Sequence, residues 1–155
     1  MIVVKTPKDL MAYVGKRLGT SDWMTISQDM IDRFADVTGD DNWIHVDAAR
    51  AAATMPGGRT IAHGFLTLSM TPLLGRQIMK VEATGRAINY GADNLRFPAP
   101  VPSGTRIRLN LDLKDASERP DGGVRFILAS TVDGEGQAKP VCTFDKLLLI
   151  YPSGP

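Results

Sequence analysis

The chain has 155 residues, of which 43% are hydrophobic and 23% charged, and its formal net charge is +1. These values are typical of a soluble globular protein with most simply one domain, residues 1–155, and the near-neutral charge argues against a nucleic acid or an anionic membrane as partner. The single cysteine, Cys142, excludes an internal disulfide and fits a reducing compartment. Neither a signal peptide nor a membrane-spanning run is visible, so a cytoplasmic protein is expected.

Helical patterns occupy the first half of the chain. Apolar residues at helical spacing predict a helix that begins after Ser27, a good N-cap, and ends at Gly39 in a left-handed cap. A second, short helix is expected to begin at Asp47 and to use the alanine-rich run that follows. Residues 62–79 carry apolar side chains on nearly every face, which predicts a buried helix with a kink at Pro72.

The second half of the chain changes to a period of two. Residues 105–114 alternate between apolar and polar side chains with few exceptions, which predicts a strand with one buried face. Similar runs at 86–97, 124–132 and 141–151 predict three more strands. The short connections favour antiparallel neighbours, because a parallel crossover usually needs a helix. The sequence therefore predicts an α+β domain in which a curved antiparallel sheet wraps a buried helix.

Two residues suited to proton transfer, Asp40 and His45, lie five positions apart in what the patterns predict as a loop between two helices. A carboxylate and an imidazole that lie close together can hold one water molecule between them and move its proton. This is the minimum equipment for adding water to a double bond or removing it. Asp40 directly follows a helix C-terminus, where the partial negative charge disfavours a carboxylate and supports a protonated imidazole.

Three segments resemble motifs of a known family, and they keep the family's order. Residues 40–45 read Asp-Asp-Asn-Trp-Ile-His and resemble the hydratase motif D-x-N-P-x-H of the MaoC-like (R)-specific enoyl-CoA hydratases. Residues 61–65 resemble the start of that family's central helix, and residues 96–104 resemble its sheet segment ending P-V-x-x-G. The chain is most similar to the short, single-domain NodN-like branch. Trp43 replaces the usual proline, so packing must fix the loop instead.

The resemblance implies a hot-dog fold, a homodimer and an acyl thioester substrate carried on coenzyme A or an acyl carrier protein. It implies hydration of a trans-2-enoyl-CoA to an (R)-3-hydroxyacyl-CoA, or the reverse dehydration, in fatty acid metabolism. Asp40 and His45 take the positions of the catalytic pair. The backbone N–H of Gly64, at the start of the buried helix, is the candidate donor to the thioester oxygen. The thioester itself activates the alkene, so no cofactor is expected; acyl chain length, carrier and direction stay open.

The neighbouring polar residues have alternative roles. His63, the second of two histidines, is predicted to be structural at the helix entry rather than a second acid or base. Asn42 either supports the site through hydrogen bonds or forms an Asx-turn. Asp40, Asp41, His45 and His63 are metal-ligand types, but no tight ligand spacing such as H-x-x-x-H or C-x-x-C occurs, so no metal is predicted. Asp41, at the variable position of the motif, is expected to face solvent, and Asp40 to lie in the apolar acyl site.

Two other functions on this fold remain open: a non-catalytic acyl-thioester binding module and an acyl-CoA thioesterase. The paired Asp40 and His45 favour the hydratase, because a binding module has no need of both. Candidate contacts to coenzyme A phosphates are four arginines whose alternative is simple solvation: Arg59, Arg76, Arg86 and Arg96. Candidate acyl-tunnel residues are three methionines whose alternative is core packing: Met55, Met70 and Met79.

Overall fold

A computed structural model describes residues 1–153 of the chain. Its main feature is an antiparallel sheet with strand order β2-β6-β7-β8-β5, in which β3 also pairs with β6. The strands are β2 (Arg17–Thr20), β3 (Met24–Thr25), β5 (Thr84–Arg96), β6 (Arg106–Glu118), β7 (Val124–Gly134) and β8 (Cys142–Pro152). A separate parallel pair joins β1 (Ile2–Val4) to β4 (Met79–Val81). The four strands predicted from the alternating runs are therefore confirmed as β5 to β8.

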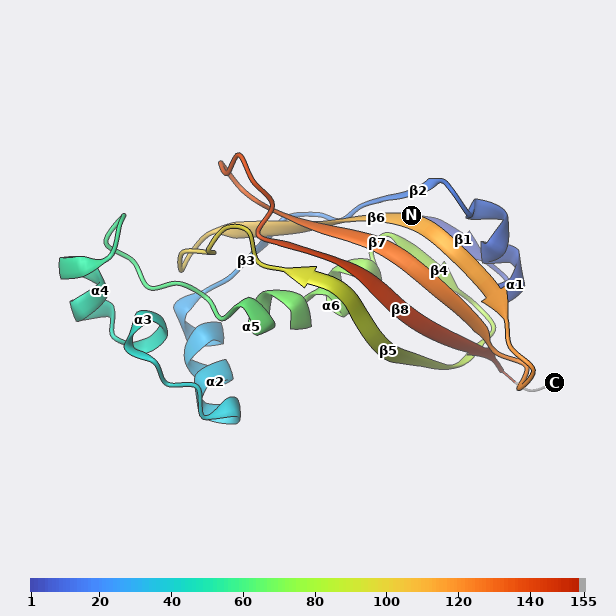
Figure 1. The fold of residues 1–155 in the computed structure, drawn as a ribbon, viewed down its shortest axis with the longest axis horizontal. Coiled ribbons are helices and arrows are strands. Elements are labelled where there is room, and N and C mark those ends of the chain that lie inside the picture. Colours follow the sequence, from blue (N-terminus) through green and yellow to red (C-terminus); the bar gives the residue numbers. More distant parts are fainter. Residues whose placement is uncertain (154–155) are drawn as a thin grey trace.

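The helices fall into groups that Figure 1 separates clearly. They are α1 (Pro7–Leu10), the 3₁₀ turn η1 (Met11–Tyr13), α2 (Gln28–Thr38), α3 (Trp43–Val46), α4 (Ala48–Thr54), α5 (Gly64–Ser69) and α6 (Thr71–Gly75). Helices α5 and α6 lie against the sheet, whereas α2, α3 and α4 gather at one end of the molecule, beyond the strands. Within residues 1–153, every helix is too short or too polar to cross a membrane.

The core lies between the inner face of the sheet and the central helices. On β6 the inward side chains alternate as predicted, and Ile107, Leu109, Leu111 and Leu113 are all buried. Phe126 and Leu128 continue the buried row on β7, and Leu66 and Leu74 meet it from α5 and α6. An antiparallel sheet around a central helical segment is the hot-dog arrangement, so the predicted α+β hot-dog fold is confirmed.

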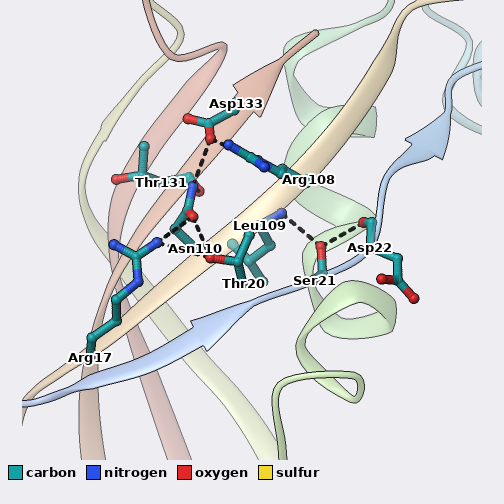
Figure 2. A network of polar contacts seen from close by, with 9 residues as sticks. All are labelled: Arg17, Thr20, Ser21, Asp22, Arg108, Leu109, Asn110, Thr131 and Asp133. Carbon is teal, nitrogen blue, oxygen red and sulfur yellow. Dashed lines mark hydrogen bonds and ion pairs between the residues drawn. The ribbon is translucent and has the colours of Figure 1, made fainter. Parts of the chain in front are cut away.

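A polar network on the outer face of the sheet joins three strands, as Figure 2 shows. The side-chain oxygen of Asn110 accepts hydrogen bonds from Arg17 at 2.7 Å and from Thr20 at 2.8 Å, which ties β2 to β6. The Asn110 amide and the Arg108 guanidinium both donate to Asp133 on β7, at 3.0 Å and 3.1 Å. The two faces of β6 therefore differ as the alternating sequence predicts, polar outside and apolar inside.

The central helix differs from its prediction in length and in burial. Residues 62–79 contain two short helices, α5 and α6, rather than one kinked helix, because Pro72 occupies the first turn of α6, where its missing N–H costs nothing. The segment is also not buried on all sides: Phe65 is 62% exposed and Leu73 is 47% exposed. One side of α5 and α6 packs on the sheet, and the other side is open.

Candidate active site

Helix α2 begins and ends where the sequence predicts, and its end places Asp40. The Ser27 hydroxyl accepts from the Met30 amide at 3.3 Å, and Gly39 ends the helix with a φ of 74°. Asp40 follows directly, and its side chain is 59% exposed. The expected apolar surroundings of Asp40 are therefore wrong for the isolated chain, in which Asp40 follows the end of α2, in the group of helices that lies beyond the strands.

His45 lies in the single turn of helix α3, not in a loop as predicted. The Asn42 side chain accepts from the Ile44 amide at 3.4 Å and caps this turn, which is the Asx-type role considered for Asn42. His45 is buried, and its Nδ1 lies 2.7 Å from the backbone oxygen of Ile61. A carbonyl oxygen only accepts, so Nδ1 carries the proton and the lone pair of the neutral ring is on Nε2.

His63 holds the backbone of Asp40 in place. It is buried at the start of α5, and its Nε2 donates to the backbone oxygen of Asp40 at 2.8 Å. Its ring stacks on His45 with 3.8 Å between centroids, and Phe34 packs 5.0 Å away on α2. Nδ1 of His63 is buried without a hydrogen-bond partner within residues 1–153. These contacts support the structural role predicted for His63.

The fold brings the acid and both histidines together. One carboxylate oxygen of Asp40, one ring nitrogen of His45 and one of His63 lie within 4.8 Å of one another. Such a spacing leaves room for one bridging water. His63 Nε2, which lies 4.0 Å from the Asp40 carboxylate, would have to give up its hydrogen bond to the Asp40 backbone before it could bind a metal ion.

Gln28 and Thr60 support the pair, and the sequence does not indicate this role for either residue. The Gln28 side-chain nitrogen donates to the backbone oxygen of His45 at 2.8 Å. Its side-chain oxygen accepts from the hydroxyl of Thr60, which is 2% exposed. The Ile61 amide next to Thr60 donates to the Ile44 backbone at 3.0 Å. In the sequence, Gln28 resembles any polar residue in the first turn of a helix, so no pattern marks this role.

Trp43, which replaces the usual proline of the motif, packs as predicted. The guanidinium of Arg50, on α4, lies over the indole ring at 4.0 Å from the ring centroid. A cation over an aromatic face is attracted to it, by about 0.5–1 kcal/mol at an exposed position. This contact links α3 to α4 and gives the turn a support that proline would otherwise provide through its fixed φ.

A cavity of about 320 Å³ borders His45 and the first turn of α5, and we call it the catalytic cavity. Gly64 and Thr67 line it from the helix, and Phe97 closes the other side. A Cβ on Gly64 would lie 2.8 Å from the Phe97 ring, so the close approach of that ring requires glycine. The first-turn amides of a helix have no partner inside it, and no side chain caps α5.

Other candidates from the sequence do not gather at this cavity. Arg59 donates to the Ser103 backbone oxygen and Arg96 to the Leu95 backbone oxygen. The Arg86 guanidinium stacks on the Tyr151 ring, 4.0 Å from its centroid.

Cys142 is buried, and burial raises the pKa of its thiol to about 12, so it stays protonated and is unsuited to act as a nucleophile.

Comparison with known proteins gives relatives along nearly the whole chain. The chain is 47% identical over 140 residues to a protein named 3-hydroxyacyl-thioester dehydratase Z from Mycobacterium tuberculosis, covering 90% of this chain and 92% of the relative. It is 43% identical over 136 residues to nodulation protein N of Rhizobium meliloti, covering 87% and 84%. Among solved structures, the unliganded R-hydratase PhaJ1 from Pseudomonas aeruginosa is similar with a TM-score of 0.68 and 27% identity, covering 91% and 83%.

The family described as MaoC like domain matches residues 9–126, which include the acid, both histidines and the central helices. This match and the two relatives agree with the family that the motifs resemble. The chain belongs to the MaoC-like dehydratase family.

Proposed function

We propose that this protein is a hydro-lyase that adds water to trans-2-enoyl thioesters to give (R)-3-hydroxyacyl thioesters, and that it also runs the reverse dehydration. Family membership and the 47% identity to a 3-hydroxyacyl-thioester dehydratase support this class of reaction. The observation that carries the proposal is the pairing of Asp40 with His45 within 4.8 Å, beside a cavity. A binding module would need neither group.

Asp40 and His45 can divide the proton transfers between them. A water held between the two side chains attacks C3 of the substrate and gives a proton to the solvent-open carboxylate of Asp40. Nε2 of the protonated His45 ring delivers a proton to C2, while Nδ1–H stays bound to the Ile61 carbonyl. Both groups act from one face of the alkene, so the addition is syn. Proton transfer from Asp40 back to His45 then restores the starting state.

The thioester oxygen needs a hydrogen-bond donor as it gains enolate character. The Gly64 amide is the candidate, because it opens α5 and borders the catalytic cavity. A preorganised donor of this kind typically lowers the barrier by about 3–4 kcal/mol. This role would add a second constraint on Gly64, beside the close approach of Phe97.

The activity is tested directly by following the ultraviolet absorbance of an enoyl-CoA as protein is added. We expect the absorbance to fall, free thiol to stay constant, and the product to be the (R)-3-hydroxyacyl-CoA on chiral analysis. Release of thiol would instead show a thioesterase. Tight binding without any change in absorbance would show a binding module. Substrates of increasing chain length, offered on coenzyme A and on an acyl carrier protein, define the preferred substrate.

We also propose that the protein is a homodimer in which the β5 strands of two copies lie side by side. Strand β5 is the edge of the sheet, and large apolar side chains lie exposed on it and on the open side of the central helices: Tyr90 and Phe65 are each 62% exposed. An open edge of this kind favours pairing with another strand. Sedimentation should show a dimer at micromolar concentration, and a fully active monomer would contradict the proposal.

A further inference from the structure

Lys146 lies in an otherwise apolar row on the inner face of β8. The other members of that row, Cys142, Phe144, Leu148 and Ile150, are buried. Lys146 is partly buried, and it makes no ion pair or side-chain hydrogen bond within residues 1–153. Loss of hydration is what lowers the pKa of its ammonium group. A charged side chain thus occupies a place where the strand pattern favours a hydrophobic one.

The surroundings of Lys146 form a cavity of about 320 Å³ between the sheet and α6, which we call the cationic cavity. Its floor is apolar and includes Leu109, Leu111 and Leu128. Two further cations, Arg76 and Lys80, border it, and no aspartate or glutamate lines it. An adjoining cavity of about 330 Å³ shares Lys146 and extends to the end of α5.

Three cations border the apolar floor, and the partly dehydrated ammonium of Lys146 has no counter-charge among the residues that line the cavity. Lysine side chains often lie along apolar surface with the charged end in water, and such a lysine needs no ligand. Here Lys146 instead borders two cavities, and the charged groups beside it are positive. An anion would supply the missing counter-charge and replace the interactions with water that burial removes. The arrangement therefore suits a ligand with an apolar body and an anionic end.

The cationic cavity and the catalytic cavity lie along the same pair of helices. Gly64 and Thr67 border the catalytic cavity, and Thr71 borders the cationic one. Thr71 lies seven positions after Gly64, which corresponds to roughly 10 Å along the helical segment at about 1.5 Å per residue. Leu68 and Ser69 line the adjoining cavity between them. An acyl chain whose thioester lies at Gly64 would therefore run along α5 toward Lys146.

We infer that the preferred acyl chain carries a carboxylate at the end remote from the thioester, and that Lys146 binds this group. The inference rests on the proposed function, because it takes the acyl chain to begin at the catalytic cavity. Arg76 and Lys80, which are exposed at the rim, attract the anion, and the leucines of the floor contact its methylene chain. The protein would then select substrates by both ends of the acyl group.

The test compares two matched series of trans-2-enoyl-CoA substrates over a range of chain lengths, one ending in a methyl group and one in a carboxylate. At the length that reaches Lys146, kcat/KM should be about 10–100-fold higher for the carboxylate, the usual worth of a hydrogen bond to a charged group. Lys146→Met should abolish this preference, Lys146→Arg should keep it, and Lys146→Glu should reverse it. The matched control is Lys114→Met. Lys114 forms an ion pair with Asp145 at 2.9 Å and does not line the cationic cavity, so this variant should keep the carboxylate preference.

A binding measurement separates failure of this inference from failure of the proposed function. Calorimetry with saturated acyl-CoA thioesters of both series needs no turnover, and the carboxylate series should bind tighter to the wild type but not to Lys146→Met. If that holds while no enoyl-CoA is hydrated, the Lys146 assignment stands and the proposed reaction is wrong. If the methyl series is hydrated and no length shows a carboxylate preference, the assignment is overturned. The Lys146 assignment is also overturned if the wild type shows no carboxylate preference and Lys146→Met dissociates the dimer.

Discussion

The sheet and the segment α2 to α4 are held in different ways. The strands combine continuous backbone pairing with rows of buried apolar side chains, such as the four on β6. Residues 28–58 contribute only Ile31, Ala35 and Ala51 to the buried apolar residues described in the chain. This end is instead tied down by polar contacts from Gln28, His45 and His63 to backbone oxygens. The proposed catalytic pair thus lies in the part of the molecule with the smaller apolar core, so stability and activity should respond to different substitutions.

The largest expected effect follows from His45→Gln. It removes the ring that would deliver a proton to C2, and kcat on an enoyl-CoA should fall about 10²–10⁴-fold. The double variant with Asp40→Asn should be little slower than either single variant, because the two groups act on one water. Steady-state kinetics on the folded variants measures both effects. Full activity in His45→Gln would remove this residue from the mechanism.

A core substitution should show the opposite pattern. Leu113→Ala deletes a fully buried side chain of β6 that borders neither the catalytic nor the cationic cavity. We expect the free energy of unfolding to fall by about 2–5 kcal/mol, with kcat of the folded protein unchanged. Denaturant titration measures the loss, and Leu113→Met is the matched control, with an expected cost under about 1.5 kcal/mol. A large fall in kcat would contradict the separation of the two regions.

Gln28 tests whether the polar contacts position His45. Gln28→Met removes three hydrogen bonds, those with the His45 backbone, Thr60 and Asp32, and leaves the buried Thr60 hydroxyl without its partner, so we expect a loss of about 1–3 kcal/mol in stability. A misplacement of about 1 Å can lower a rate as much as 10²-fold, and kcat should fall within that limit with KM nearly unchanged. Gln28→Glu keeps the acceptor for Thr60 but loses the donors to the His45 backbone oxygen and to Asp32, and it faces both with a negative charge, so it should lower kcat as well as stability. Unchanged kcat in both variants would show that Gln28 is not a positioning residue.

The smallest expected effect concerns the stacking of Arg50 on Trp43. Arg50→Ala should lower the free energy of unfolding by about 0.5–1 kcal/mol, the usual value of an exposed cation–π contact. In a Trp43→Pro background, which restores the usual residue of the motif, the same substitution should cost nothing measurable. Thermal melting of the four proteins gives this coupling energy. Equal costs in both backgrounds would show that the contact does not stabilise the turn.

The sequence predicts best those elements whose pattern spans several turns or strand residues. Strands β5 to β8 and helix α2 are long enough to show a period, and Ser27 and Gly39 mark the ends of α2. The prediction of one central helix buried on all sides is wrong because Pro72 begins a new helix, and because apolar side chains that face an open side look the same in sequence as buried ones. The short elements β1 to β4, α1 and η1 contain too few residues for any period to show.

At the candidate site, the sequence predicts residue types but not their contacts. The spacing and the motif point to Asp40 and His45, yet the four-residue helix that holds His45 is too short to recognise. The contact between His63 and the Asp40 backbone joins residues 23 positions apart, and no local pattern encodes it. The exposure of Asp40 also could not be predicted, since it depends on how far the end of α2 extends beyond the sheet.

The central claim is that Asp40 and His45 act on one water, and it is tested most directly by comparing Asp40→Asn with Asp41→Asn. Both carboxylates are exposed and adjacent, so each substitution removes one negative charge from nearly the same place. We expect both variants to melt close to the wild type, with stability changed by no more than about 0.5 kcal/mol. Asp40→Asn should lower kcat for enoyl-CoA hydration about 10²–10⁴-fold, and Asp41→Asn should leave it unchanged. An inactive Asp41→Asn beside a fully active Asp40→Asn would contradict the account.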